Sequence, residues 1–385
     1  MIWYDVEKYK GDYKLNQRLF FLDNIRVFLT ILLVIFHTSI AYGAAGSWIL
    51  EDVDKSDVNA TVALLTIFTA VCQSFFMGLF FFISSYFFPT SYEKKGAFRF
   101  LSGRLVRLGI PLLTYYFVIG PMTVWFAKFR DQQTLVQFYK DNVWSFRWTF
   151  FGPTWFLEAS IYFTLLYVLF RFVIRDRFKM RSMLFPNGKT LVVVAIVLGL
   201  IAFVVRLIYP TGTGPLELQL GYFPSYILLF IAGIIAQKQR WLEQIPEKLQ
   251  RIWKWVAIGM IPVLPLGLIL TGGLEGDVHF EGGFNIQALF YAMWEPFICL
   301  GIIISMLSFF IRRFNKTNVL SKWLSENAYT VYLIHPPIIV GWTLAFHGID
   351  LPAIIKWIIV SALSIAVCFI GASVIRMLPY ARRVL

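Results

Sequence analysis

Charged residues are scarce in this chain of 385 residues. Only 15% are Asp, Glu, Lys or Arg, whereas roughly a quarter is usual for a soluble domain. Apolar residues make up 58% of the chain, and 18% of all residues are aromatic. A composition so poor in charge argues against a soluble enzyme and indicates that lipid, not water, is the main solvent.

Cysteine is also rare, and its placement argues against redox chemistry. A thiol within an apolar run behaves as a small hydrophobic side chain. Neither a disulfide framework nor a metal site is expected, because all three cysteines lie in apolar runs and none has CxxC spacing (Cys72, Cys299 and Cys368).

The motifs of several enzyme classes are absent. The chain has no Gly-rich phosphate loop, no G-x-S-x-G elbow and no His-rich cluster. It also lacks the H-x-x-x-x-D pattern of glycerol acyltransferases, since Tyr42 stands five residues after His37 and Val340 five after His335. Metal-dependent and serine-nucleophile mechanisms are therefore disfavoured, and no metal is expected.

The net charge of +13 does not indicate nucleic acid as a partner. Binding to nucleic acid requires a basic face or domain that contacts the phosphates. Here the basic residues are scattered over short connections, where membrane topology and contact with anionic lipids explain them.

Ten apolar runs are long enough to cross a bilayer, which takes roughly 20 residues in a helix. They predict an all-α, polytopic membrane helix bundle in one membrane domain, residues 21–376, between a segment 1–20 and a tail 377–385. The first twenty residues are charged and have no apolar core, so they do not resemble a cleavable signal peptide. The predicted spans are 25–42, 60–82, 105–126, 154–172, 191–208, 222–236, 255–271, 286–311, 328–346 and 351–374.

Lysine and arginine separate the connections into two sets. Of the 35 basic residues, 27 fall in the termini and in every second connection, and five in the alternate connections. The positive-inside rule then predicts that both termini are cytoplasmic. We expect a multi-pass protein of the cell membrane. One missed or extra span would mix the two sets, so the asymmetry also supports the count of ten.

The first span carries the densest set of ionisable residues. Asp23, Arg26 and His37 fall within about 60° on one helical face, and Arg26 and His37 lie about 16 Å apart along the axis. An imidazole kept neutral in a site of low dielectric can act as a general base. Asp23 and His37 are therefore the candidate catalytic residues. The alternative is a salt bridge between Asp23 and Arg26 at the membrane rim, with His37 bonded to a neighbouring carbonyl.

Two further arginines form an R-x-x-R pair at the start of the third span. Arg104 and Arg107 are three residues apart and share a helical face, where two guanidinium groups can bind phosphate. With Arg26 they are the candidate residues for a phosphate-bearing ligand. The alternative is a positive-inside stop signal.

Other polar residues lie within the predicted spans, where a charge is costly and is a functional candidate. Trp155 and Glu158 begin the fourth span and suit an external acceptor site. Glu295 and His335 lie nearer the middle of the membrane, as mutual partners or lining one cavity. Gln73 and Arg206 complete the set, and Arg206 is expected to snorkel at the outer end of its span.

Five segments together resemble the acyltransferase 3 family of integral membrane O-acyltransferases. The resemblance runs from about residue 19 to about residue 374, in the order of the family and with ten spans. One departure is Ser85, where the family often has glycine. The segments are FLDNIRVFLTILLVIFH (21–37), FFFISSYFF (80–88), RLVRLGIP (104–111), PTWFLEA (153–159) and SENAYTVYLIHPP (325–337).

The resemblance implies transfer of an acyl group from cytoplasmic acyl-CoA to a hydroxyl of an extracytoplasmic or lipid-linked glycan. Acetyl-CoA is the first expectation and succinyl-CoA the second. The family's histidine falls on His37, its partner arginine on Arg26, and its R-x-x-R pair on Arg104 and Arg107. The length and the lack of an appended hydrolase-like domain are similar to the branch that includes periplasmic glucan succinyltransferases.

The residues and the resemblance support one mechanism. The arginines hold the CoA phosphates at the cytoplasmic face, and His37 removes the proton of the attacking hydroxyl. A covalent acyl-histidine is a variant that the sequence does not exclude. Trp155, Glu158, Glu295 and His335 are the candidate acceptor-binding residues.

The alternative function is export or transport of a polysaccharide or small molecule. Intramembrane Arg, Glu and His also suit ion coupling, and transporters often contain broken helices. The sixth span is short and has Gly221, Pro224 and Gly233 in or beside it, so it is the candidate for a broken or re-entrant helix.

Overall fold

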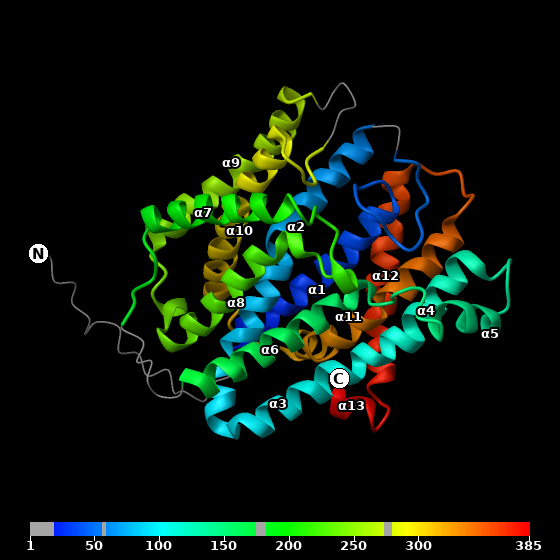
Figure 1. Cartoon of the computed structure of the whole chain (residues 1–385), viewed down its shortest axis with the longest axis horizontal. Helices are drawn as coiled ribbons and strands as arrows, with labels where there is room; N and C mark the ends of the chain where they lie inside the picture. Colours follow the sequence, from blue (N-terminus) through cyan, green and yellow to red (C-terminus); the bar gives the residue numbers. More distant parts are fainter. Residues whose placement is uncertain (1–18, 56–58, 175–181, 273–278) are drawn as a thin grey trace, which may run out of the picture.

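A computed structural model describes residues 19–55, 59–174, 182–272 and 279–385 (Figure 1). Except for residues 19 and 20, the predicted segment 1–20 lies outside the described residues. Within the described ranges the chain forms helices and no strand. The long helices are α1 (Phe20–Ala41), α2 (Ala60–Tyr86), α3 (Phe88–Thr114), α6 (Trp155–Ile174), α7 (Gly188–Arg206), α8 (Phe223–Lys238), α9 (Glu247–Leu270), α10 (Ile286–Arg313), α11 (Val319–Phe346) and α12 (Ala353–Ile375). The short ones are α4 (Gly120–Val124), α5 (Leu135–Phe138) and α13 (Ala381–Val384).

Ten helical segments in the described part of the chain are long and apolar enough to cross a membrane. They confirm the predicted all-α bundle of about ten spans, and the chain is a multi-pass membrane protein. The third segment is longer than predicted, because α3 continues through two π-helical turns and α4 to Phe129. Asparagine side chains cap the starts of four of these helices, α2, α7, α10 and α11.

Helix α1 lies in the middle of the bundle. It packs against α2, α10, α11 and α12, whereas α3 and the pair α7 and α9 lie toward opposite edges (Figure 1). Leu22, Ile25, Leu29 and Val34 of α1 are fully buried. One side of α1 therefore packs against other helices along most of its length.

Helix α8 corrects the expectation of a broken sixth span. It is a continuous α-helix that follows a single 3₁₀ turn at Leu220–Tyr222. Its Gly233 lies so close to α2 that a Cβ atom there would collide with Ser85 and with the carbonyl of Phe82. The small residue on α8 thus makes room for Ser85.

Contacts between helix ends agree with the two sets of connections. At one side of the bundle, Asn24 Nδ2 of α1 donates to the carbonyl of Phe314 after α10 at 2.7 Å. At the other, Lys356 Nζ of α12 donates to Asp52, between α1 and α2, at 2.8 Å. Each contact joins two connections that the charge pattern assigns to the same side. The assignment of the basic set to the cytoplasm remains a prediction.

Helix α3 bends near its start, where Gly96 has φ of 75° and nothing lies close to the position of a Cβ. The R-x-x-R pair therefore lies in the second part of α3. The sequence predicted that Arg104 begins the span, but the helix extends further toward its N-terminal end.

Candidate active site

A cavity of about 660 Å³ opens between the helix ends on one side of the bundle. Its lining comes from α1, α2, α6, α10 and α11 and from the connections that follow α1, α5, α7 and α9. These connections belong to the basic-poor set, which is predicted to be extracytoplasmic. The chemistry-bearing and aromatic residues of the lining include His37, Trp48, Gln73, Trp155, Tyr222 and Tyr332.

His37 lies near the C-terminal end of α1 and lines this cavity. Its ring stacks on Trp48, with ring centroids 4.2 Å apart and an interplanar angle of 23°. Trp48 belongs to the connection after α1, where its backbone N–H donates to Glu51 at 2.8 Å and Glu51 pairs with Lys55. The connection thus covers one face of the imidazole with an indole.

His335 of α11 is fully buried and contacts His37 directly. Its Nε2 lies 3.0 Å from Nδ1 of His37, although the two residues are 298 positions apart. Its Nδ1 lies 2.6 Å from the carbonyl oxygen of Tyr332. The sequence paired His335 with Glu295 or with a shared cavity, but its partner in the structure is the other candidate histidine.

The Asp23–Arg26 salt bridge lies at the opposite end of α1. Arg26 Nη2 is 2.7 Å from Asp23 Oδ1, as the rim-pair interpretation predicted. The guanidinium keeps 40% of its side-chain exposure and lies 5.8 Å from the ring of Phe87. Arg26 therefore faces the junction between α2 and α3, well away from the cavity.

Arg104 reaches the same junction. Its guanidinium lies over the ring of Phe88 at 4.6 Å and donates to Ser84 Oγ at 3.2 Å and Thr164 Oγ1 at 3.4 Å. Phe87 and Phe88 are consecutive, so they bring Arg26 and Arg104 to one region.

Arg107 is more exposed and contacts α11. Its guanidinium lies 5.7 Å from the ring centre of Tyr329, whose hydroxyl donates to the Arg107 carbonyl at 2.7 Å. The three arginines thus gather at the end of the bundle opposite the cavity, where the basic connections lie.

Trp155 and Glu158 begin α6, as predicted, but only Trp155 lines the cavity. Its ring stacks on Tyr226 with centroids 5.7 Å apart. Glu158 is buried at 4% exposure and accepts a hydrogen bond from Tyr162 at 2.7 Å. Of Trp155 and Glu158, only Trp155 can contact a molecule in the cavity.

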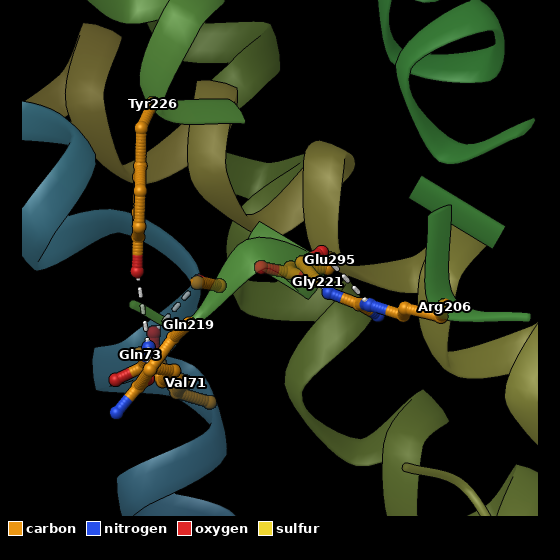
Figure 2. Close-up of polar contacts among 8 residues, drawn as sticks. Val71, Gln73, Arg206, Gln219, Gly221, Tyr226 and Glu295 are labelled. Carbon is orange, nitrogen blue, oxygen red and sulfur yellow. Dashed lines mark hydrogen bonds and ion pairs between the residues drawn. The ribbon is translucent and has the colours of Figure 1, made fainter. Parts of the chain in front are cut away.

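Arg206 and Glu295 form an ion pair behind the cavity wall (Figure 2). Arg206 is 1% exposed, its Nε donates to the Gly221 carbonyl at 3.1 Å, and the rings of Tyr222 and Tyr291 lie 5.0 and 5.2 Å from it. The expectation that Arg206 snorkels is wrong, because the carboxylate and two aromatic faces replace water around its charge.

Gln73 of α2 joins a second polar group beside this pair. Figure 2 shows it reaching toward Tyr226, to whose hydroxyl it donates at 3.1 Å, and toward Gln219 at 3.5 Å. Gln73 and Gln219 both line the cavity. Two amides beside tryptophan and tyrosine rings can hydrogen-bond to and stack on the hydroxyls and faces of a sugar.

The sequence missed the cavity residues that lie in connections or lack charge. Three of these residues lie outside or at the edge of the apolar runs and carry no charge: Trp48, Gln219 and Tyr222. The pattern of ionisable residues within spans therefore does not mark them. A cluster of aromatic and amide residues in basic-poor connections was the available signal. Tyr332 lies within the segment SENAYTVYLIHPP (325–337), and its hydroxyl donates to the Pro153 carbonyl at 2.5 Å.

The described residues contain no group of three or more His, Cys, Asp or Glu side chains that could hold a metal ion. Each cysteine is buried. The histidines at the cavity can transfer protons, and the arginines at the opposite end can bind anions.

Comparison with known proteins identifies the family. A family model described as an acyltransferase domain matches residues 19–373. The glucans biosynthesis protein C of Escherichia coli K12 is 35% identical over 98 residues, which cover 26% of this chain and 24% of that protein. The same protein of E. coli O9:H4 gives the same values. The match thus spans about a quarter of the length of these relatives. No solved structure matches the chain.

Proposed function

We propose that this chain, which belongs to the acyltransferase 3 family, transfers an acyl group from acyl-CoA to a hydroxyl of a glycan. The donor binds at the arginine end, in the cytoplasm, and the acceptor enters the cavity from the extracytoplasmic side of the cell membrane. Acetyl-CoA is the first candidate donor and succinyl-CoA the second. Since the relatives are named for glucan biosynthesis, a glucan is the first acceptor to test.

One observation carries this proposal. A single helix, α1, bears an imidazole that lines a cavity at one end and a guanidinium beside two further arginines at the other. Along the helix axis these groups are separated by about 16 Å. The long pantetheine arm of CoA can cover such a distance while its phosphates stay at the arginines.

The proposed reaction starts with His37. Its free ring nitrogen removes the proton of an acceptor hydroxyl as that oxygen attacks the thioester carbonyl. The tetrahedral intermediate then collapses, the carbon–sulfur bond breaks, and the CoA thiolate leaves. The imidazolium of His37 returns its proton to this thiolate, which yields free CoA, an ester and the original base.

The proposed donor site uses the three arginines. Phosphate groups accept from guanidinium donors in pairs, so Arg104 and Arg107 supply two binding groups and Arg26 a third. Asp23 is proposed to hold Arg26 in place. This differs from a direct catalytic role, because its carboxylate lies at the end of α1 far from His37.

The proposed acceptor site is the cavity. Trp155 and Trp48 offer ring faces, and Gln73 and Gln219 offer amides. Glu295 is proposed to act on the acceptor through Arg206, whose guanidinium lies against the rings of Tyr222 and Tyr291 in the cavity lining. Glu158 bonds to Tyr162 outside the cavity lining, so no contact with the acceptor is proposed for it. His335 acts through His37.

The test uses the full chain in lipid nanodiscs, labelled acyl-CoA and a soluble glucan. His37→Ala should lower kcat by about 10²- to 10⁴-fold, the usual contribution of a general base. His279→Gln is the matched control, because His279 does not line the cavity. Each variant then lacks one of the four histidines. Unchanged turnover in His37→Ala would rule out the proposed base.

The donor site has its own test. Arg104→Ala/Arg107→Ala should raise KM for acyl-CoA about 10- to 100-fold, because two charge-assisted contacts are lost. Lys94→Ala/Lys95→Ala removes the same charge from the exposed first part of α3 and should leave KM nearly unchanged. Equal effects in the two double variants would mean that net charge alone attracts the donor. Movement of unmodified glucan into vesicles without acyl transfer would instead favour the exporter.

A further inference from the structure

A proline in the middle of α11 lies directly after His335. In an α-helix the carbonyl of Tyr332 would accept from the backbone N–H of residue 336, but residue 336 is proline and has no N–H. The carbonyl is therefore released from the helix ladder. It lies 2.6 Å from Nδ1 of His335, one position before the proline.

A carbonyl oxygen can only accept, so this contact fixes where the proton of His335 resides. Nδ1 must be the donor, and in the neutral ring Nε2 then carries the lone pair. That lone pair lies 3.0 Å from Nδ1 of His37. Nδ1 of His37 must in turn be the donor, which leaves the lone pair of His37 on Nε2.

The tautomer of His37 matters because only one of its nitrogens is left for the cavity. Its Nδ1 lies against Nε2 of His335, and the ring lines the cavity beside Trp48. The backbone of Leu33, one turn earlier in α1, is a further hydrogen-bond partner of this ring. A base whose lone pair pointed at His335 would not accept a proton from a molecule in the cavity. Buried at 0% exposure, His335 has no solvent to bond instead.

We propose that His335 is a positioning residue that fixes His37 in the Nδ1–H tautomer, and that Pro336 orients His335 by freeing the Tyr332 carbonyl. This inference rests on the proposed role of His37 as general base. In the reaction the hydroxyl proton moves to Nε2 of His37 and then to the leaving thiolate. His335 exchanges no proton, and its lone pair stabilises the imidazolium through the Nδ1–H bond.

Three substitutions separate this role from packing. His335→Leu fills a similar space without an acceptor and should lower kcat about 10- to 100-fold while KM for acyl-CoA changes less than about twofold. His335→Gln places an amide oxygen near the position of Nε2 and should recover most of the activity. Pro336→Ala restores the competing N–H and should lower kcat a few-fold, whereas Pro337→Ala, which acts on the Leu333 carbonyl, should not.

A spectroscopic measurement reads the tautomer without acyl transfer. The chain has four histidines, so solid-state ¹⁵N NMR of ring-labelled protein in lipid vesicles gives few signals, and the loss of signals in His37→Ala assigns those of His37. The wild type and His335→Gln should show His37 protonated at Nδ1 and bare at Nε2. His335→Leu should show a mixture of tautomers.

The outcomes are distinct. Full kcat together with an unchanged tautomer in His335→Leu overturns the positioning role, as does a wild-type His37 protonated at Nε2. Equal loss in the Gln and Leu variants would assign His335 to packing and also overturns it. If the wild type transfers no acyl group while the NMR shows the expected tautomer, the proposed function fails and the fixed tautomer stands.

Discussion

Two arginine–carboxylate pairs in this protein have the same chemistry and opposite surroundings. Asp23–Arg26 lies at the rim of α1, where the arginine side chain keeps 40% exposure. Arg206–Glu295 joins α7 to α10 with exposures of 1% and 2%. The rim arginine can exchange partners with a ligand, whereas the buried one is enclosed by its carboxylate and two tyrosine rings. The difference indicates that an intramembrane charge is not by itself a ligand site, because its surroundings decide what it can reach.

The largest expected change in stability comes from a substitution that breaks the buried pair. Glu295→Ala leaves the Arg206 charge without a counterion in a dry site, which costs about 3–5 kcal/mol. The thermal unfolding midpoint of the purified protein in detergent should fall sharply, and folded yield with it. Asp23→Ala is the matched variant at the rim. A similar fall in the unfolding midpoint of both variants would mean that burial does not determine how much each pair contributes to stability.

A double substitution tests whether the buried pair is required for the fold. Arg206→Met/Glu295→Leu removes both charges and keeps apolar volume, and apolar replacements of buried pairs are often neutral or stabilising. We expect its unfolding midpoint to lie well above that of Glu295→Ala. A midpoint as low as that of the single variant would show that the hydrogen bond from Arg206 to Gly221 is also essential.

The rim pair should affect donor binding more than stability. The pair is only partly buried, with side-chain exposures of 40% for Arg26 and 12% for Asp23, so Asp23→Asn should change the unfolding midpoint less than Glu295→Ala does. Because Asp23 is proposed to hold Arg26 in place, loss of the carboxylate should raise KM for acyl-CoA by about two- to threefold. Asp23→Glu keeps a carboxylate and should restore KM, whereas an unchanged or lower KM in Asp23→Asn would contradict this role of Asp23.

Ionic strength tests the same comparison through screening. Raising ionic strength from 0.1 to 1 M shortens the Debye length from about 10 to about 3 Å, which screens exposed arginines and leaves buried pairs nearly unaffected. KM for acyl-CoA should rise several-fold, while the difference in unfolding midpoint between wild type and Glu295→Ala stays constant. A salt-dependent difference would indicate that water reaches Arg206.

The local features of the fold were predictable. Hydropathy and loop charge are properties of neighbouring residues, so the ten spans and the two sets of connections follow from the sequence, and both Asp23–Arg26 and the face shared with His37 follow from helical spacing. Span ends were less accurate, since α3 continues through π-helical turns that an apolar run does not mark. Among the site residues, Trp48 was not predicted, because an uncharged tryptophan in a connection carries no pattern that distinguishes it from other aromatic residues.

The sequence by itself determined that this protein lies in lipid and which segments form the spanning helices. It also determined the position of the proline that frees a carbonyl beside His335. The partners of its buried polar groups were decided only by tertiary structure. His335 lies 298 residues from His37, and Glu295 lies 89 from Arg206. Such partners share no local pattern, because a buried charge or imidazole must find a partner wherever packing brings a complementary group within hydrogen-bond distance.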